Sequence, residues 1–156
     1  MLAGDELRAV MGRFPAGVAV VTVDLDGQRT GLTVASLVSL SLEPPLVGAA
    51  IRRDAALHEL LREAGPFAVS MLGSEQEAVA QHFARGVPPI ALWKGIAIRD
   101  RGGPPHLEGA VGWLDCRAIA EHPAGDHTFF VGEVEGAEAG PALSPLVFYR
   151  QSYVTL

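Results

Sequence analysis

Residues 31–47 constrain the fold more than any other stretch, because hydroxyl and aliphatic side chains alternate along them. Three hydroxyl residues fall on odd positions, Thr33, Ser39 and Ser41, and five aliphatic residues fall on even ones, Leu32, Val34, Val38, Leu40 and Leu42. Side chains alternate between the two faces of a strand, so the run predicts one strand with a hydroxyl face and an apolar face. The double proline at 44–45 ends it, since proline cannot donate to a ladder. The hydroxyl face suits a polar, extended ligand, and a solvent-facing strand side explains the same pattern.

The composition favours one domain with a substantial core. The chain has 156 residues, of which 49% are hydrophobic and only 19% charged, and its mean hydropathy is +0.26. That length suits a single domain spanning residues 1–156. The apolar character is consistent with surface buried against a second copy. The net charge of −6 and the lack of a basic stripe argue against nucleic acid as a partner.

Cysteine and histidine usage argues against a disulfide or a metal site. Cys116 is the only cysteine, and the five histidines are scattered without a metal-ligand spacing. Cys116 lies in an expected strand, where a small buried hydrophobe is the ordinary interpretation. No N-terminal stretch resembles a secretion signal and no run reaches about 18 apolar residues, so we expect a cytoplasmic protein with no membrane partner.

Segments with strand patterns outnumber helical ones along the chain. Helices are expected at 7–14, at 54–65 with Asp54 as N-cap, and at 74–86 with a capping box from Ser74 to Glu77. Further strands are expected at 18–23, 46–51, 67–72, 96–98, 109–121, 128–138 and 146–153, with a hairpin turn at 24–27. So many strands in a chain of this size predict a mostly β fold, an antiparallel barrel with short peripheral α-helices.

Three further clusters carry groups that can bind a ligand, and each has a plainer interpretation. Arg52 and Arg53 at a helix start can hold a phosphate, or form a solvated charged loop. His127, in a Gly-Asp-His turn, can be fixed in one tautomer and donate to a ligand, or lie there incidentally. The aromatic–arginine run at 148–150, which includes Tyr149, can stack on a ring, or supply a core aromatic to an edge strand. Rossmann and P-loop motifs are absent, so a nucleotide must bind by another geometry.

Taken in order, these segments resemble the flavin reductase-like family, whose fold is the FMN-binding split barrel. The resemblance lies in stretches that match in order and spacing: Met11–Val18, Gly31–Ser36, Ser39–Leu46, Gly65–Leu72, Phe83–Ala84, Gly125–Val134 and Pro145–Arg150. No single motif is decisive, but the ordered set is specific and covers nearly the whole chain.

The resemblance implies an NAD(P)H:flavin oxidoreductase that transfers a hydride from NADH or NADPH to FMN or FAD, often for a separate monooxygenase. It also implies an antiparallel split β-barrel and a homodimer with flavin near the subunit interface. The implied flavin site consists of Thr33, Val34, Ala35, Ser36, Ser39, Ile51, Arg52, Arg53, Phe83, Ala84, His127 and Tyr149. In that implied site, residues 33–36 contact the flavin ring and ribityl chain through backbone and hydroxyl groups, and the two arginines lie near the phosphate. His127 and Tyr149 lie near the ring and the nicotinamide, with His127 orienting a group rather than moving a proton.

One departure from the family concerns the flavin phosphate. Where many members carry a Ser-x-Thr pair whose hydroxyls bind it, this chain reads Ala55-Ala56-Leu57. Each lost hydrogen bond to a charged group costs about 1.5–3 kcal/mol, so losing two weakens binding by about a hundredfold or more. Either the arginines and backbone N–H groups suffice, or flavin is a loose substrate, or the ligand has changed. The alternative function is therefore a non-catalytic protein that binds flavin or another planar cofactor, and a third is a scaffold without a ligand.

Overall fold

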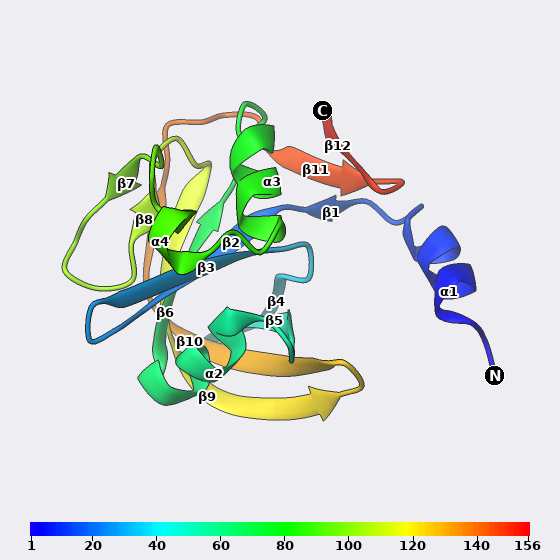
Figure 1. The fold of residues 1–156 in the computed structure, drawn as a ribbon, viewed down its shortest axis with the longest axis horizontal. Coiled ribbons are helices and arrows are strands. Elements are labelled where there is room, and N and C mark those ends of the chain that lie inside the picture. The colour runs from blue at the N-terminus through cyan, green and yellow to red at the C-terminus, as the bar shows by residue number, and fades with distance from the viewer.

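The computed structural model describes residues 1–156, and antiparallel strands dominate it (Figure 1). The helices are α1 (Gly4–Met11), α2 (Ala56–Ala64), α3 (Glu77–Ala84) and α4 (Pro89–Leu92). The strands are β1 (Ala16–Gly17), β2 (Ala19–Leu25), β3 (Gln28–Val34), β4 (Val38–Leu42), β5 (Pro45–Arg52), β6 (Pro66–Met71), β7 (Ile98–Arg99), β8 (His106–Leu107), β9 (Gly112–Ala124), β10 (His127–Ala139), β11 (Leu146–Tyr149) and β12 (Ser152–Thr155). Among the helices, none has both the length and the apolar character required to span a membrane.

Seven strands form the main sheet, in the order β3-β2-β6-β9-β10-β5-β4, and every neighbouring pair is antiparallel. A three-stranded sheet, β1-β11-β12, and the β7-β8 pair complete the fold. The β2–β3 hairpin lies where the sequence predicts it. Its two turn residues, Asp26 and Gly27, have positive φ angles of 52° and 88°, as a tight hairpin turn requires. The mostly β, antiparallel class with short α-helices is confirmed, and the split form of the barrel stays a prediction.

Strand β2 is buried on both faces and separates two apolar clusters. Val21 belongs to a cluster of 13 buried residues, whereas Val20 belongs to a second cluster of 8. Helix α2 contributes Leu57 and Leu61 to the first cluster, and α3 contributes Phe83 to the second. The two helices therefore pack on opposite sides of β2 and β3, as Figure 1 shows. This arrangement places β3 between the start of α2 and the end of α3.

The single strand expected from residue 31 to the prolines at 44–45 is wrong, because the chain bends in its middle. Residues 35–37 separate β3 from β4. Within this bend the Ser36 hydroxyl bonds across to β5: its Oγ donates to the Ala50 carbonyl and accepts from the Ala50 N–H, both at 3.0 Å. A bulge then disturbs the register of β4. The alternation holds along β3, which pairs with β2 in unbroken register, but periodicity reveals neither the bend nor the bulge, because both depend on a partner strand.

The two expected helix caps are also wrong. Helix α2 begins after Ala55, which makes no side-chain cap, and the carboxylate of Asp54 instead pairs with Arg52 at 2.8 Å. Helix α3 begins after Gln76 rather than Ser74, and the Gln76 Oε1 accepts a backbone N–H of the preceding turn at 2.8 Å. In both cases the expected cap is replaced by a contact with a group that lies just before the helix.

Both ends of the chain differ from expectation. Helix α1 ends at Met11 instead of continuing to Phe14, and none of its residues is buried. The expected strand at 146–153 is two strands, because Arg150 and Gln151 adopt positive φ angles of 51° and 62° and turn the chain between β11 and β12. The other expected elements occur with shifted ends.

Cys116 lies in the core on β9, as its sequence context predicts. Burial, reinforced by the charges of Asp115 and Glu135, raises the pKa of its thiol from 9.0 to about 12. A thiol whose pKa is higher in the folded than in the unfolded chain stabilises the protein fully below the unfolded pKa, and this contribution is lost as pH rises toward the folded pKa. We expect the free energy of unfolding in urea to fall between about pH 9 and about pH 11. The fall should be shallower in Cys116→Ala, and an identical pH dependence in the two proteins contradicts the prediction.

Candidate functional site

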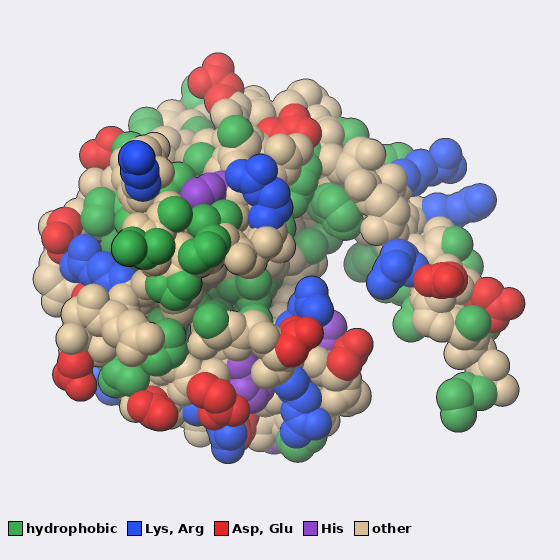
Figure 2. All heavy atoms as spheres, in the orientation of Figure 1, with side chains coloured by type: hydrophobic (Ala, Val, Ile, Leu, Met, Phe, Trp, Pro, Cys, Tyr) green, Lys and Arg blue, Asp and Glu red, His purple; other side chains and the backbone are tan.

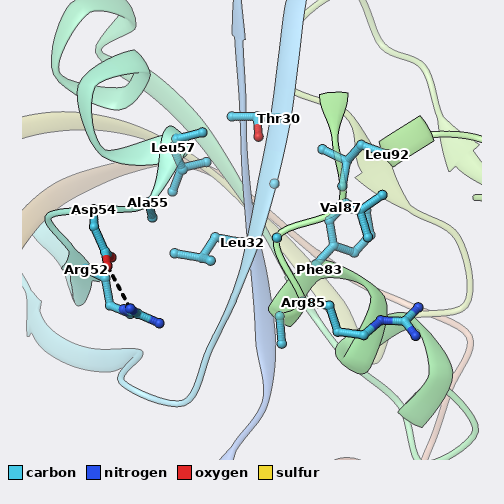
Figure 3. A pocket seen from close by; sticks show the side chains of 14 residues that line it. Thr30, Leu32, Arg52, Asp54, Ala55, Leu57, Phe83, Arg85, Val87 and Leu92 are labelled. Carbon is cyan, nitrogen blue, oxygen red and sulfur yellow. Dashed lines mark hydrogen bonds and ion pairs between the residues drawn. The ribbon is translucent and has the colours of Figure 1, made fainter. Parts of the chain in front are cut away.

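A cavity of about 300 Å³ opens between β3, the start of α2 and the end of α3. Figure 3 shows Leu32 of β3 pointing into it, with the β5–α2 loop on one side and the α3–α4 segment on the other. The remaining lining residues are Thr30, Gly31, Arg52, Asp54, Ala55, Ala56, Leu57, Phe83, Ala84, Arg85, Gly86, Val87 and Leu92. In the space-filling view the same region is a hollow between α3–α4 and α2 (Figure 2). Eight of the 14 lining residues are hydrophobic, which suits the apolar part of a small organic ligand.

Three charged side chains surround this cavity. Arg52 and Asp54 form an ion pair of 2.8 Å on the α2 side, and both are exposed (Figure 3). Arg85, at the end of α3, is exposed and takes part in none of the ion pairs of the structure. Two guanidiniums against one carboxylate leave the rim with a net positive charge, which attracts anionic ligands.

Arg85 is a site residue that sequence reasoning missed. It follows directly on the Phe83–Ala84 pair, which the family resemblance places at the flavin, and it precedes Gly86, which ends the helical segment with a φ of 66°. The sequence feature that could have indicated Arg85 is its position at the end of a helix, next to two residues that were already expected in the site. Leu32, Val87 and Leu92 were also missed, because an apolar side chain in a strand or helix carries no signal that separates a cavity wall from a core.

The hydroxyls of the 33–36 segment are engaged inside the protein. The Thr33 Oγ1 donates to the Ala80 carbonyl of α3 at 2.7 Å, and the Ser36 hydroxyl is shared with the backbone of Ala50. Ala35 and Ser36 line a second, open cavity of about 750 Å³, together with the aromatic rings of Phe14 and Phe148. The segment therefore lies between the two cavities, and it offers a ligand mainly its backbone groups.

Arg53 points away from the 300 Å³ cavity and ties the β5–α2 loop to the β9–β10 hairpin. Its backbone N–H donates to the Asp126 carbonyl at 3.0 Å, and its guanidinium reaches the Gly125 carbonyl at 3.5 Å. Arg52, the neighbouring residue on β5, is the one that lines the cavity. The structure thus separates the two arginines that the sequence groups together.

His127 begins β10 directly opposite Arg52 in the β5–β10 pairing. Its Nδ1 lies 2.6 Å from Asp126 Oδ1, and its side chain is 37% exposed. The hydrogen bond and the charge of His127 hold the pKa of Asp126 below its usual range. The imidazole is therefore oriented by a neighbouring carboxylate while its other nitrogen is available, although it does not line either cavity described above.

The other expected site residues lie at different depths. Phe83 and Ala84 line the 300 Å³ cavity, whereas Val34 and Ile51 are buried in the core below it. Ser39 is exposed on the edge strand β4, and Tyr149 is half-buried under the Arg150 guanidinium at 5.5 Å from the ring centroid. The structure thus brings Arg52, Phe83 and Ala84 together around β3 and leaves Ser39 and Tyr149 outside the lining of this cavity.

Behind the cavity, the buried side chain of His58 joins α2 to β10. Its Nε2 lies 2.7 Å from Thr128 Oγ1, and its Nδ1 lies 3.2 Å from Glu59 Oε1. The ring packs edge-on against Phe130, with 5.4 Å between the centroids. Because β10 pairs with β5, this contact fixes the first turn of α2 relative to both strands. His58 sits on the apolar face of a helix and gave no sequence signal of this role.

Curated proteins resemble the chain over nearly its whole length. The reductase component of 4-hydroxyphenylacetate 3-monooxygenase from Thermus thermophilus is 40% identical over 149 residues, which cover 96% of this chain and 94% of that protein. An NADH-dependent flavin reductase from Rhodococcus is 40% identical over 154 residues, covering 96% of this chain and 85% of the relative.

Solved structures share the fold. Flavin reductase PheA2 superimposes with a TM-score of 0.89 at 31% identity and covers 99% of both chains. The NADH:FAD oxidoreductase SgcE6 of Streptomyces globisporus, in complex with NAD and FAD fragments, has a TM-score of 0.89 at 37% identity and covers 96% of this chain and 90% of its own. The sequence pattern described as "Flavin reductase like domain" matches residues 11–156. The chain therefore belongs to the flavin reductase-like family.

Proposed function

We propose that this protein is an NAD(P)H:flavin oxidoreductase, which transfers a hydride from NADH or NADPH to FMN or FAD. The observation that carries this proposal is the 40% identity to an NADH-dependent flavin reductase over 96% of the chain. Other relatives are named as reductase components of monooxygenases. We therefore propose that the reduced flavin is delivered to a separate monooxygenase component.

The residues around β3 fit a flavin. Leu32, Phe83 and Leu92 offer apolar contact to a planar ligand, and the 33–36 backbone offers hydrogen-bonding groups beside them. Arg52 and Arg85 supply positive charge at the rim. A bound flavin supplies the ring that accepts the hydride. This chain's own residues then have to bind and orient the flavin and the nicotinamide, so no acid–base side chain is essential.

A homodimer is part of the proposal. Helix α1 stands apart from the body of the molecule (Figure 1), and its apolar side chains, with those of the following loop and of β4, are exposed: Leu7, Val10, Met11, Phe14, Val38, Leu40 and Leu42. Monomeric proteins rarely expose so many large apolar side chains along one helix and one edge strand. A second copy packed here would also close the 750 Å³ cavity beside Ala35 and Ser36. One domain over residues 1–156 and a cytoplasmic location complete the proposal.

The test uses the purified protein with NADH or NADPH and added FMN or FAD. We expect nicotinamide oxidation, followed by the loss of the absorbance of the reduced nicotinamide, to depend on the added flavin. The second candidate function is a non-catalytic flavin-binding protein, favoured by the lack of hydroxyls at Ala55 and Leu57. That protein would show the visible spectrum of a bound flavin without turnover. No flavin-dependent oxidation with either nicotinamide would rule out the reductase.

His127→Ala tests the orienting role of the imidazole. We expect flavin-dependent NADH oxidation to slow by about tenfold, because a lost positioning contact acts mainly on the reacting geometry. The dissociation constant for FMN should change by less than about threefold, since His127 does not line the cavity around β3. His122→Ala, in the exposed part of the β9–β10 hairpin, is the matched control. Equal rates of NADH oxidation in His127→Ala and the unsubstituted protein would contradict the orienting role of His127.

A further inference from the structure

We infer that His58 is a positioning residue for hydride transfer. Through the hydroxyl of Thr128 it anchors the start of β10 in the core, and it thereby sets the direction in which the neighbouring imidazole of His127 points. This inference rests on the proposed function, in which His127 orients the nicotinamide. Neither His58 nor Thr128 lines the cavities of about 300 Å³ and 750 Å³ beside β3, so their effect on the reaction has to pass through a neighbouring residue.

The contact between His58 and Thr128 is a buried polar pair. Both residues are only 4% exposed, and the Nε2 of His58 lies 2.7 Å from Thr128 Oγ1. The surroundings are apolar, because the ring packs against Phe130 and Thr128 pairs with Ile51 of β5. Water does not compensate a buried polar atom that loses its partner, so each of the two groups restrains the other strongly.

The bonding partners fix the orientation of the His58 ring. Its Nδ1 lies 3.2 Å from Glu59 Oε1, and a carboxylate only accepts, so Nδ1 carries a proton. In the neutral ring Nε2 is then the acceptor, and the Thr128 hydroxyl donates to it. Glu59 is held in turn by Arg62 at 3.2 Å, and the Arg62 guanidinium also reaches Glu121 of β9 at 3.0 Å. The ring therefore has one defined tautomer and one defined direction.

Thr128 directly follows His127 on β10, so the two side chains lie on opposite faces of the strand. On the neighbouring strand β5, the partner of Thr128 is the buried Ile51, whereas the partner of His127 is Arg52, which lines the cavity of about 300 Å³. A strand that is anchored through one face cannot rotate about its axis without breaking that anchor. Thr128 thus determines where His127 points on the face that it shares with Arg52.

The side chain of His127 has no firm attachment of its own. Its hydrogen bond joins Nδ1 to Asp126 Oδ1 at 2.6 Å, and the Asp126 side chain is 94% exposed. An exposed partner restrains the imidazole only weakly. Strand β10 also begins at His127, directly after the turn at Gly125, whose φ is 65°. The nearest buried anchor is therefore the bond between Thr128 and His58.

The test replaces Thr128 by valine, which has nearly the same shape but no hydroxyl. The full-length protein with saturating FMN is mixed anaerobically with saturating NADH, and the loss of the visible absorbance of FMN gives the rate of flavin reduction. We expect Thr128→Val to slow this step by about fivefold, because the imidazole is less well oriented. The dissociation constant for FMN should change by less than about threefold, since Thr128 does not line the cavity.

Two further variants serve as controls. Thr128→Ser keeps the hydroxyl and should restore the rate of flavin reduction. Thr22→Val removes an equally buried hydroxyl, which donates to the Pro105 carbonyl at 2.7 Å, from a site far along the chain from β10. It should lower stability in the same way as Thr128→Val without slowing flavin reduction.

A double-mutant cycle separates positioning from a merely structural role. If Thr128 acts through His127, Thr128→Val slows flavin reduction in the unsubstituted protein but not in the His127→Ala background. His58→Leu removes the partner from the other side of the contact and should slow the reaction to the same extent. Combining His58→Leu with Thr128→Val should slow it no further, because either change alone already breaks the bond.

NMR of the histidine ring nitrogens in the flavin-free protein gives a readout that does not depend on turnover. The His58 signals should show the tautomer with a protonated Nδ1, and the His127 signals should shift in Thr128→Val but not in Thr22→Val. His127 signals that do not move overturn the inference while leaving the reductase function standing. So does a Thr128→Val protein that reduces FMN as fast as Thr22→Val, or that is slowed equally in the His127→Ala background.

Two outcomes reach further than this inference. A His127→Ala protein that reduces FMN at the full rate overturns the orienting role of His127 and the inference that depends on it. An unsubstituted protein that reduces no flavin with either nicotinamide overturns the proposed function, and the inference with it.

Discussion

Phe130→Ala is expected to lower the free energy of unfolding by about 3–5 kcal/mol, the usual cost of removing a fully buried aromatic ring. Phe130 is 2% exposed and belongs to the larger core cluster. It also packs against His58, so the cavity left behind lies directly under α2. The first turn of α2 lines the cavity on β3. The folded fraction of the variant should therefore also bind flavin more weakly than the unsubstituted protein does. Urea denaturation measures the free energy of unfolding. A fluorescence titration with flavin, under conditions in which the protein is folded, measures the affinity.

The neighbouring Phe129 supplies the control, because it points to the opposite face of the same strand and is only half-buried. Phe129→Ala should cost clearly less stability than Phe130→Ala and should leave α2 in place. If the two variants are equally destabilised, burial of Phe130 under α2 is not the main cause of the loss of stability. If Phe130→Ala is destabilised but binds flavin normally, the link between the core and the first turn of α2 is wrong.

Phe14→Asp is expected to weaken the proposed dimer by about 2–4 kcal/mol, or about 30- to 700-fold in dissociation constant. The Phe14 ring is 71% exposed and lines the 750 Å³ cavity between α1 and the body of the protein. Few contacts within one chain are lost, so the free energy of unfolding of the monomer should change little. A carboxylate placed in an apolar interface, in contrast, has no partner to compensate its desolvation. Sedimentation equilibrium over a range of concentrations measures the effect.

Flavin turnover should fall together with the dimer, since Ala35 and Ser36 line the same cavity as Phe14. The control is Ile90→Asp on α4, an apolar side chain that is 96% exposed and lies outside that cavity. It should change neither assembly nor turnover. A monomeric unsubstituted protein, or an unchanged association constant in Phe14→Asp, contradicts the dimer that the exposed faces of α1 and β4 support.

Local sequence patterns succeeded where the relevant contacts are themselves local. The β2–β3 turn, the burial of Cys116 and most strands follow from residues that are neighbours in the chain. The strand expected from residue 31 to the prolines at 44–45 failed because its bend at Ser36 depends on β5. The two helix caps failed because Asp54 and Gln76 bond to groups just before their helices instead of capping the first turn. Ser36 bonds to β5 and Asp54 bonds to Arg52, and no periodicity within either segment encodes those contacts.

The sequence by itself determined the strand-rich class and the family, and it predicted the region around β3 as the place where a ligand binds. Only the tertiary structure decided which groups in that region are available to the ligand. The Thr33 hydroxyl is taken by α3 and Arg53 is taken by the β9–β10 hairpin, whereas Arg85 is left unpaired beside the cavity. A polar side chain is available only when no other protein group satisfies it. The competing groups come from elements far away in the chain, so their effect appears only once those elements pack together.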